Sequence, residues 1–113
     1  MDCLFCKICE GTIPAEIVFE NERLVAFKDI NPQAPTHVQL IPRKHIPSLL
    51  EVGEEDRETI GEIVETAASL ARASGFSEDG FRLAINTGPS AGQSVYHLHV
   101  HLLGGRSFGW PPG

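Results

Sequence analysis

Three histidines alternate with apolar residues between Val95 and Leu103. Because the side chains of a β-strand point to opposite faces in turn, a strand over this segment sends the apolar residues into a core. The other face then carries three imidazoles, each about 6.7 Å from the next along the backbone: His97, His99 and His101. Such a row can bind a metal ion, or it can supply a neutral imidazole that acts as a nucleophile near pH 7.

The loop before these histidines, Gly88–Ser94, is rich in glycine. Four consecutive residues there offer backbone N–H groups and one hydroxyl, a combination that holds phosphate oxygens: Gly92, Gln93, Ser94 and Val95. Glycine also lacks the Cβ atom that would keep an anion away. A glycine loop alone is more often a simple turn, but next to the row of histidines it favours a phosphate group as the target.

Three cysteines lie within the first nine residues: Cys3, Cys6 and Cys9. The number is odd and the chain starts too polar for a secretory signal, so metal binding or free thiols are favoured over a disulfide framework. The pair Cys3 and Cys6 has the Cys-x2-Cys spacing of zinc sites, and Cys6 with Cys9 could compete for the same role. We therefore expect a cytoplasmic protein whose cysteines either bind zinc or remain free.

The net charge of −6 arises from fifteen acidic residues against nine lysines and arginines. An acidic chain is unsuited to non-specific binding of a nucleic-acid backbone or an anionic membrane, which both need positive charge. No apolar run approaches the roughly 18 residues of a membrane span. A small anionic ligand remains compatible with this charge, because local N–H groups can hold it. We expect neither nucleic acid nor a membrane as a partner.

Hydrophobic periodicity and turn residues predict the elements that must position these side chains. The predicted strands are Ile17–Glu20, Leu24–Asp29, Thr36–Pro42, Phe81–Asn86 and Val95–Leu103. A long helix from about Glu54 to Ser74 carries an apolar stripe, and a short helical turn at Lys7–Glu10 ends at Gly11. The sequence therefore predicts an α+β fold. We expect a single domain over residues 1–113, with an antiparallel sheet of about five strands, one long helix and a short N-terminal helix.

The segment His97–Leu103 resembles the His-φ-His-φ-His-φ-φ signature of the histidine triad (HIT) family of nucleotide hydrolases and transferases. Further stretches resemble other conserved parts of that family: Phe27–His37, Ile41–Ile46 and Gly92–Val95. The ending, with Gly104–Arg106 and Trp110–Gly113, is similar to the branch of histidine triad nucleotide-binding proteins, which hydrolyse purine nucleoside phosphoramidates. The resemblance covers nearly the whole chain and implies a HIT-like fold.

The resemblance also implies a catalytic group: His99, His101, His37 and Ser94. By this analogy His99 attacks the α-phosphorus and forms a nucleotidyl-histidine, which water then hydrolyses. His101 and the Ser94 hydroxyl contact phosphate oxygens and share the developing charge, and His37 completes the cluster. No metal is required for this catalysis.

A purine nucleotide is the implied ligand, with these binding residues: Phe27, Asp29, Ile30, Asn86, Gly92, Gln93 and Val95. Asp29 corresponds to the carboxylate for the ribose hydroxyls, and Asn86 to the amide near the ribose-phosphate. The apolar slot for the base also includes Phe5, Ile8 and Ile13. Gln39 is a departure, since the family more often has an apolar residue there, and it leaves the choice between adenine and guanine open.

A structural zinc site is implied at four residues that many bacterial members share: Cys3, Cys6, His45 and His97. The resemblance further implies a homodimer in which the C-terminal tail of one chain approaches the active site of the other. Three alternatives stay open: a dinucleoside polyphosphate hydrolase or nucleotidyl transferase that uses the same His99, a nucleotide-binding regulatory protein, and a single catalytic metal site formed by the three histidines of the row.

Overall fold

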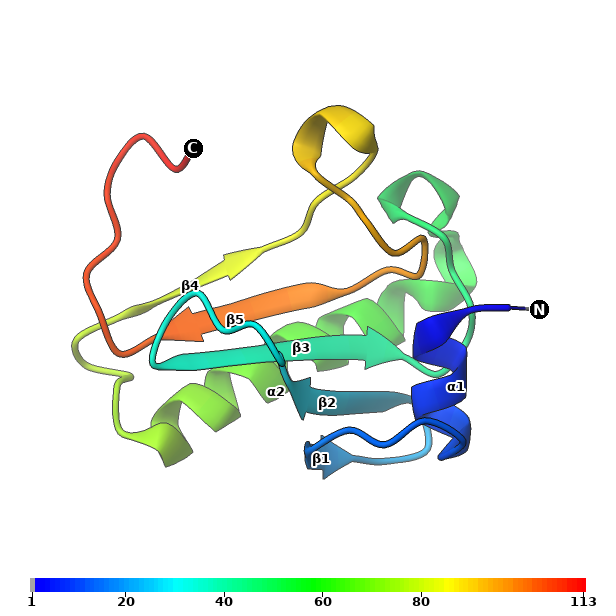
Figure 1. Cartoon of the computed structure of the whole chain (residues 1–113), viewed down its shortest axis with the longest axis horizontal. Helices are drawn as coiled ribbons and strands as arrows, with labels where there is room; N and C mark the ends of the chain where they lie inside the picture. The colour runs from blue at the N-terminus through cyan, green and yellow to red at the C-terminus, as the bar shows by residue number, and fades with distance from the viewer. Residues whose placement is uncertain (1) are drawn as a thin grey trace.

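One antiparallel sheet organises the chain, which is seen in a computed structural model that describes residues 2–113. The strand order is β1-β2-β3-β5-β4 (Figure 1). The strands are β1 (Ile17–Glu20), β2 (Leu24–Lys28), β3 (Thr36–Pro42), β4 (Phe81–Ala84) and β5 (Val100–Gly104). The helices are α1 (Leu4–Glu10) and α2 (Arg57–Ser74), with short 3-10 turns η1 (Leu49–Glu51), η2 (Glu54–Asp56) and η3 (Pro89–Ala91). The predicted α+β class, the five-stranded antiparallel sheet and both helices are confirmed.

Different helices cover the two faces of the sheet. α2 lies behind the sheet in Figure 1 and forms one core with alternate strand residues: Leu24, Ala26, Val38, Leu40, Val100 and Leu102, packed on Ile63, Ala67 and Ala71 of the helix. α1 belongs to a second core on the opposite face: Cys3, Phe5, Ile8, Val25, Phe27 and Ile41. The predicted alternation along β3 is confirmed, because Val38 and Leu40 join the α2 core whereas Ile41 joins the α1 core.

The last strand begins five residues later than predicted, at Val100 instead of Val95, and ends at Gly104, one residue beyond the expected Leu103. In the register of β3 with β5, Leu40 lies opposite Val100, so Pro42 would come opposite Leu98. Proline has no N–H to donate and cannot continue the ladder. The N–H of Leu98 instead donates to the carbonyl of Ile46 at 2.7 Å. The backbone before Val100 is thereby freed from the sheet.

Other element ends also differ from the sequence-based boundaries. α1 begins three residues earlier than predicted, since the Cys3 sulfur accepts the N–H of Cys6 and caps the helix. β2 stops at Lys28 and β4 at Ala84, which leaves Asp29 and Asn86 just beyond strand ends. The first turn of the long helix is the 3-10 turn η2. Within residues 2–113, no helix combines the length and apolar character needed to span a membrane.

Candidate active site and metal cluster

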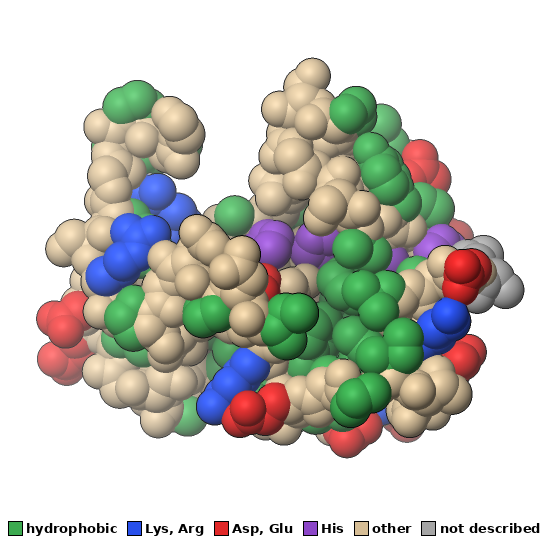
Figure 2. Space-filling model, in the orientation of Figure 1, with side chains coloured by type: hydrophobic (Ala, Val, Ile, Leu, Met, Phe, Trp, Pro, Cys, Tyr) green, Lys and Arg blue, Asp and Glu red, His purple; other side chains and the backbone are tan. Residues whose placement is uncertain are grey.

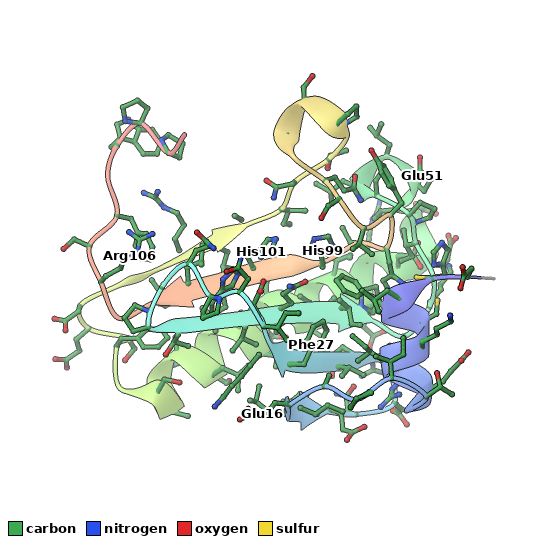
Figure 3. All side chains as sticks on the ribbon, in the orientation of Figure 1. Glu16, Phe27, Glu51, His99, His101 and Arg106 are labelled. Carbon is green, nitrogen blue, oxygen red and sulfur yellow. The ribbon has the colours of Figure 1, made fainter. Side chains whose placement is uncertain are left out.

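A cavity of about 480 Å³ opens on the sheet face that α1 covers. One end is apolar: Leu4, Phe5, Ile8, Ile13, Pro14, Ala15, Phe27 and Val95. The other end is polar: Asp29, Gln39, Asn86, Gly92, Ser94, His99 and His101. Figure 2 shows histidine side chains next to a group of hydrophobic side chains on this face. Figure 3 shows His99 and His101 on the same side of β5 and Phe27 at β2, with β3 between these strands. An apolar slot that leads to imidazoles can hold a ligand with a flat apolar end and a charged end.

His99 lies at the junction of the two ends of the cavity and is only 6% exposed. Its Nδ1–H donates to the backbone carbonyl of His97 at 2.8 Å. In a neutral imidazole this bond assigns the hydrogen to Nδ1 and leaves a lone pair on Nε2. The ring is also held between Phe5 and His101, whose ring centroids lie 5.1 and 5.0 Å away. His99 is therefore a fixed imidazole with one unprotonated nitrogen beside the cavity.

His37 and His101 form a chain of hydrogen bonds that starts at the backbone. The N–H of Gln33 donates to Nδ1 of His37 at 3.0 Å, so this nitrogen carries no hydrogen in the neutral ring. His37 Nε2–H then donates to Nδ1 of His101 at 2.9 Å. The hydrogen of His101 is left on Nε2. This series of hydrogen bonds thus fixes the tautomers of both rings. It leaves His101 with an Nε2–H donor that makes no hydrogen bond to any described residue.

Burial keeps both of these histidines neutral near pH 7. It lowers the pKa of His101 to about 4, and the neighbouring imidazoles of His99 and His37 add to this effect. Burial also lowers the pKa of His37, although the Asp29 carboxylate, 3.4 Å from Nε2, opposes the shift. Neutral imidazoles can donate or accept hydrogen bonds without a fixed positive charge in the cavity.

Asp29 follows β2 directly and turns its carboxylate toward the polar end of the cavity. Its Oδ1 accepts the backbone N–H of Asn31 at 2.8 Å, and its Oδ2 accepts the side-chain amide of Gln39 at 2.6 Å. Asn86 also lines the polar end, as the sequence predicts. Ile30 borders the cavity but its side chain is fully exposed, so it covers no part of the apolar slot within this chain.

The glycine-rich loop is braced from inside by Gln93. The side-chain carbonyl of Gln93 accepts the N–H of Gly88 at 2.9 Å, and its amide donates to the carbonyls of Pro47 and Val95. This side chain is buried and does not line the cavity, unlike the neighbouring Ser94. The structure therefore brings Ser94 toward the predicted site, while the Gln93 side chain lies behind the loop.

The first histidine of the row belongs to a different cluster. Four side-chain atoms converge there: the sulfurs of Cys3 and Cys6 and the Nδ1 atoms of His45 and His97. The Sγ atom of Cys6 lies 3.4 Å from His45 Nδ1 and 3.6 Å from His97 Nδ1, and the two nitrogens are 3.3 Å apart. Because His97 reaches this cluster, the three histidines of the row do not converge on one shared metal position.

The spacing of these four atoms fits a tetrahedral zinc ion. With Zn–S bonds of about 2.3 Å and Zn–N bonds of about 2.0–2.1 Å, tetrahedral ligands lie about 3.6 Å apart for S and N and about 3.3 Å for two nitrogens. His97 Nε2–H donates to the carbonyl of Pro42 at 2.7 Å, which leaves Nδ1 free to bind a metal. Burial and the neighbouring Cys3 raise the pKa of the Cys6 thiol, so a thiolate there needs a cation beside it.

Some residues around the cavity were not singled out from the sequence. Leu4, Pro14 and Ala15 border the apolar end, and Lys28 lies at its edge. The segment between α1 and β1 has no periodicity, and no pattern in it pointed to a site. The backbone N–H of Gln33 could not be found from residue types at all, because every non-proline residue carries such a group.

Known proteins resemble this chain over nearly its whole length. Residues 10–108 match the family model of the HIT domain. The chain is 48% identical over 112 residues to the 14 kDa zinc-binding protein of Zea mays, covering 97% of this chain and 87% of that protein. It is 44% identical over 108 residues to the purine nucleoside phosphoramidase of Escherichia coli, covering 96% and 91% respectively.

A solved structure of a HIT family hydrolase from Legionella pneumophila superposes with a TM-score of 0.97 at 53% identity, covering 99% of this chain and all of that one. That agreement extends from the sheet to both helices, and the matched stretch of the family model contains every histidine of the cavity and of the metal cluster. The sequence pattern, the fold and the comparisons agree: the chain belongs to the HIT domain family.

Proposed function

We propose that the protein is a nucleotide hydrolase that cleaves purine nucleoside 5′-phosphoramidates through a nucleotidyl intermediate on His99. The observation that carries the proposal is the hydrogen bond from His99 Nδ1 to the carbonyl of His97, since it leaves the Nε2 lone pair available at the cavity. The name of the Escherichia coli relative, a purine nucleoside phosphoramidase at 44% identity, supports the same substrate class.

In the first step, His99 Nε2 forms a bond to the α-phosphorus while the P–N bond breaks. The electron pair of the broken bond leaves with the amine, which takes up a proton. The positive charge that develops on the His99 ring strengthens the Nδ1–H bond to the carbonyl of His97. In the second step, the oxygen of a water molecule bonds to the same phosphorus and loses a proton while the bond from phosphorus to His99 Nε2 breaks. The electron pair of that bond returns to the ring, the nucleoside monophosphate leaves, and His99 is neutral again.

The polar end of the cavity would stabilise the charge on the phosphoryl oxygens. His101 Nε2–H is an available donor, and the Ser94 hydroxyl and the backbone N–H groups of Gly92 and Val95 belong to residues that line the cavity. Asp29 would bind the ribose, Asn86 the region between ribose and phosphate, and the purine would occupy the slot beside Phe27 and Phe5. Gln93 would act through the shape of the loop that it braces.

We propose that zinc is bound by Cys3, Cys6, His45 and His97 and that its role is structural. Four protein ligands complete a tetrahedron and leave no open position for substrate. When bound, the ion would hold the N-terminal segment against the loops that carry the two histidines. The zinc-binding protein of Zea mays, at 48% identity, supports the choice of metal.

We also propose a two-fold homodimer, built from the free edge of the sheet and the outer side of α2. β4 is an edge strand, and Gly61 and Val64 lie exposed on α2, where a Cβ on Gly61 would meet no atom of this chain. Trp110 is 84% exposed, which suits a tail that contacts a partner. The cytoplasmic location stays a prediction, supported by cysteines that form no disulfide.

Mass spectrometry of the enzyme quenched during turnover of adenosine 5′-phosphoramidate tests the chemistry. We expect an adenylyl group on the peptide that contains His99, and no adduct in the His99→Ala variant. A parallel reaction with a dinucleoside polyphosphate measures the alternative substrate class. Turnover without any adduct on a histidine, or faster cleavage of the dinucleotide than of the phosphoramidate, would count against the proposal.

A further inference from the structure

Gln39 occupies the middle of the cavity wall, between its two chemically different ends. In the sheet register it lies opposite Phe27 of β2 on one side and opposite His101 of β5 on the other. It thus lies between the apolar slot and the imidazoles. The mechanism above gives Gln39 no role, and a glutamine is a costly residue to place on a largely buried strand.

The orientation of the Gln39 amide is determined by its neighbour. Its Nε2 donates to Asp29 Oδ2 at 2.6 Å. The reversed amide would place its carbonyl oxygen against a carboxylate, two acceptors without a hydrogen between them. The side-chain oxygen, Oε1, is buried and has no hydrogen-bond partner within residues 2–113. Buried acceptors are rarely left unpaired in proteins. Here only the donor half of the amide makes a hydrogen bond within the described residues.

That donor sets the number of hydrogen bonds that Asp29 can still accept. A carboxylate offers about four lone-pair directions, two on each oxygen. One on Oδ1 is taken by the N–H of Asn31, and one on Oδ2 by Gln39. His37 Nε2 lies 3.4 Å from Oδ2, but its hydrogen is committed to His101. One direction therefore remains on each oxygen of Asp29.

We infer that Gln39 is a positioning residue that makes Asp29 a two-acceptor site for a vicinal diol and so selects ribonucleotides over deoxynucleotides. The inference rests on the proposed function, because it takes the ligand of the cavity to be a nucleotide. Two adjacent hydroxyls of a ribose supply two donors, which match the two remaining acceptor directions. A 2′-deoxy or 3′-deoxy sugar supplies one donor and leaves one carboxylate direction, already removed from water, without a partner.

An apolar residue at position 39 would leave Oδ2 with an additional free direction and the carboxylate free to rotate. Asp29 would still attract a sugar hydroxyl, but its two acceptors would no longer be held toward the diol. The consequence is specific to the sugar: binding of the complete ribonucleotide should weaken more than binding of either deoxy analogue. A general loosening of the cavity would instead weaken all three by the same factor.

Calorimetric titration with AMP, 2′-deoxy-AMP and 3′-deoxy-AMP measures this without any need for turnover. For the wild-type protein we expect AMP to bind about 10-fold or more tightly than each deoxy analogue, and for Gln39→Met a ratio below about 3-fold. In Asp29→Asn, where the carboxylate is absent, adding Gln39→Met should leave the ratio unchanged. Melting curves identify any variant that fails to fold, and Gln39→Leu serves as the second apolar replacement.

The outcomes separate this inference from the proposed function. Equal binding of all three nucleotides by the wild-type protein overturns the diol selection while the nucleotide site stands. A Gln39→Met protein that keeps the wild-type ratio overturns the role of Gln39. Failure of the wild-type protein to bind any of the three nucleotides overturns the proposed function, and the inference with it.

Discussion

The ring of Phe5 lies edge-on against the imidazole of His99, with centroids 5.1 Å apart and the ring planes at 89°. Phe5 belongs to α1 and lies between Cys3 and Cys6 in the sequence. His97, another residue of the metal cluster, supplies the carbonyl that accepts the Nδ1–H of His99. The metal cluster is therefore connected to the proposed nucleophile in two ways. One is the ring of Phe5, which is next to the cysteines in sequence, and the other is the backbone carbonyl of His97.

Replacing Phe5 with leucine should raise KM strongly while lowering the free energy of unfolding only slightly. We expect a cost of about 1 kcal/mol in the free energy of unfolding, and a KM raised by about 10-fold as the slot and His99 lose their support. Phe76→Leu is a matched control, since Phe76 packs in the α2 core away from the cavity. It should lower the melting temperature without changing KM. Equal KM values for the two variants would contradict the coupling.

Replacing His99 with alanine should abolish turnover while preserving the fold. We expect kcat for adenosine 5′-phosphoramidate to fall by about 10⁴-fold or more, because no other group can form the covalent intermediate. His101→Ala removes the Nε2–H donor and the partner of His37, but not the nucleophile, and should cost about 10²-fold. Steady-state kinetics with AMP titrations on both variants distinguish chemistry from binding. A His99→Ala enzyme with near wild-type kcat would rule out the assignment.

Replacing the two cysteines of the metal cluster should affect stability more than kcat. Structural zinc contributes its binding free energy to folding, so Cys3→Ser combined with Cys6→Ser should lower the melting temperature clearly. Elemental analysis of the wild-type protein, purified without added metal, should give about one zinc per chain. Cys9→Ser is the matched control, because Cys9 lies outside the cluster. A metal-free protein of unaltered stability would argue against the site.

Acid should destabilise the protein partly through His101. Its pKa is about 4 in the folded chain against an ordinary value of 6.5, so between these values the unfolded chain binds the additional proton. The contribution is therefore fully present above pH 6.5 and is lost as the pH falls toward 4. The lowered pKa of His37 acts in the same direction. Urea unfolding from pH 7.5 to pH 4.5 should show a steeper loss for wild type than for His101→Gln, and identical slopes would contradict this.

The tail beyond Gly105 should matter for selectivity if it contacts the active site of a partner. In this chain the guanidinium groups of Arg82 and Arg106 lie over the ring of Phe108, whereas Trp110 is left largely exposed. Sedimentation equilibrium should give a dimer at micromolar concentration. A chain that ends at Gly105 should keep its fold and change kcat/KM between phosphoramidates with different leaving amines. A monomer, or unchanged selectivity, would exclude the cross-subunit role.

The alternation of buried and cavity-facing side chains in the histidine segment could be predicted from the sequence. Where this segment begins to pair with β3 could not. Leu98, Val100 and Leu102 are all buried as expected, because alternation is a property of extended backbone whether or not a neighbour pairs with it. The late start of β5 depends on Pro42, which is 56 residues before Leu98 in the sequence and comes near it only in the folded sheet. A sequence pattern cannot supply that relationship.

The individual site residues were easier to predict than the contacts among them. Nearly all the residues expected at the site line the cavity or the metal cluster, since their types suit phosphate, sugar and zinc. Gln93 and His37 are the exceptions, since neither lines the cavity. The Gln93 side chain braces the loop from inside, and His37 reaches the site only through its hydrogen bond to His101. The bond from Gln39 to Asp29 depends on the register of β2 with β3, and residue types alone do not determine that register.

The hydrogen-bond chain through His37 has a consequence for proton relays. A relay through an imidazole takes a proton at one ring nitrogen and releases another from the second. At His37 the entry atom, Nδ1, accepts a hydrogen from the peptide N–H of Gln33, and a peptide group does not give up that proton. The hydrogen bonds through His37 can therefore orient the His101 ring, but they cannot deliver a proton to it from Gln33. Under the proposed function, the proton that the leaving amine takes up therefore has to reach the cavity by a route other than His37.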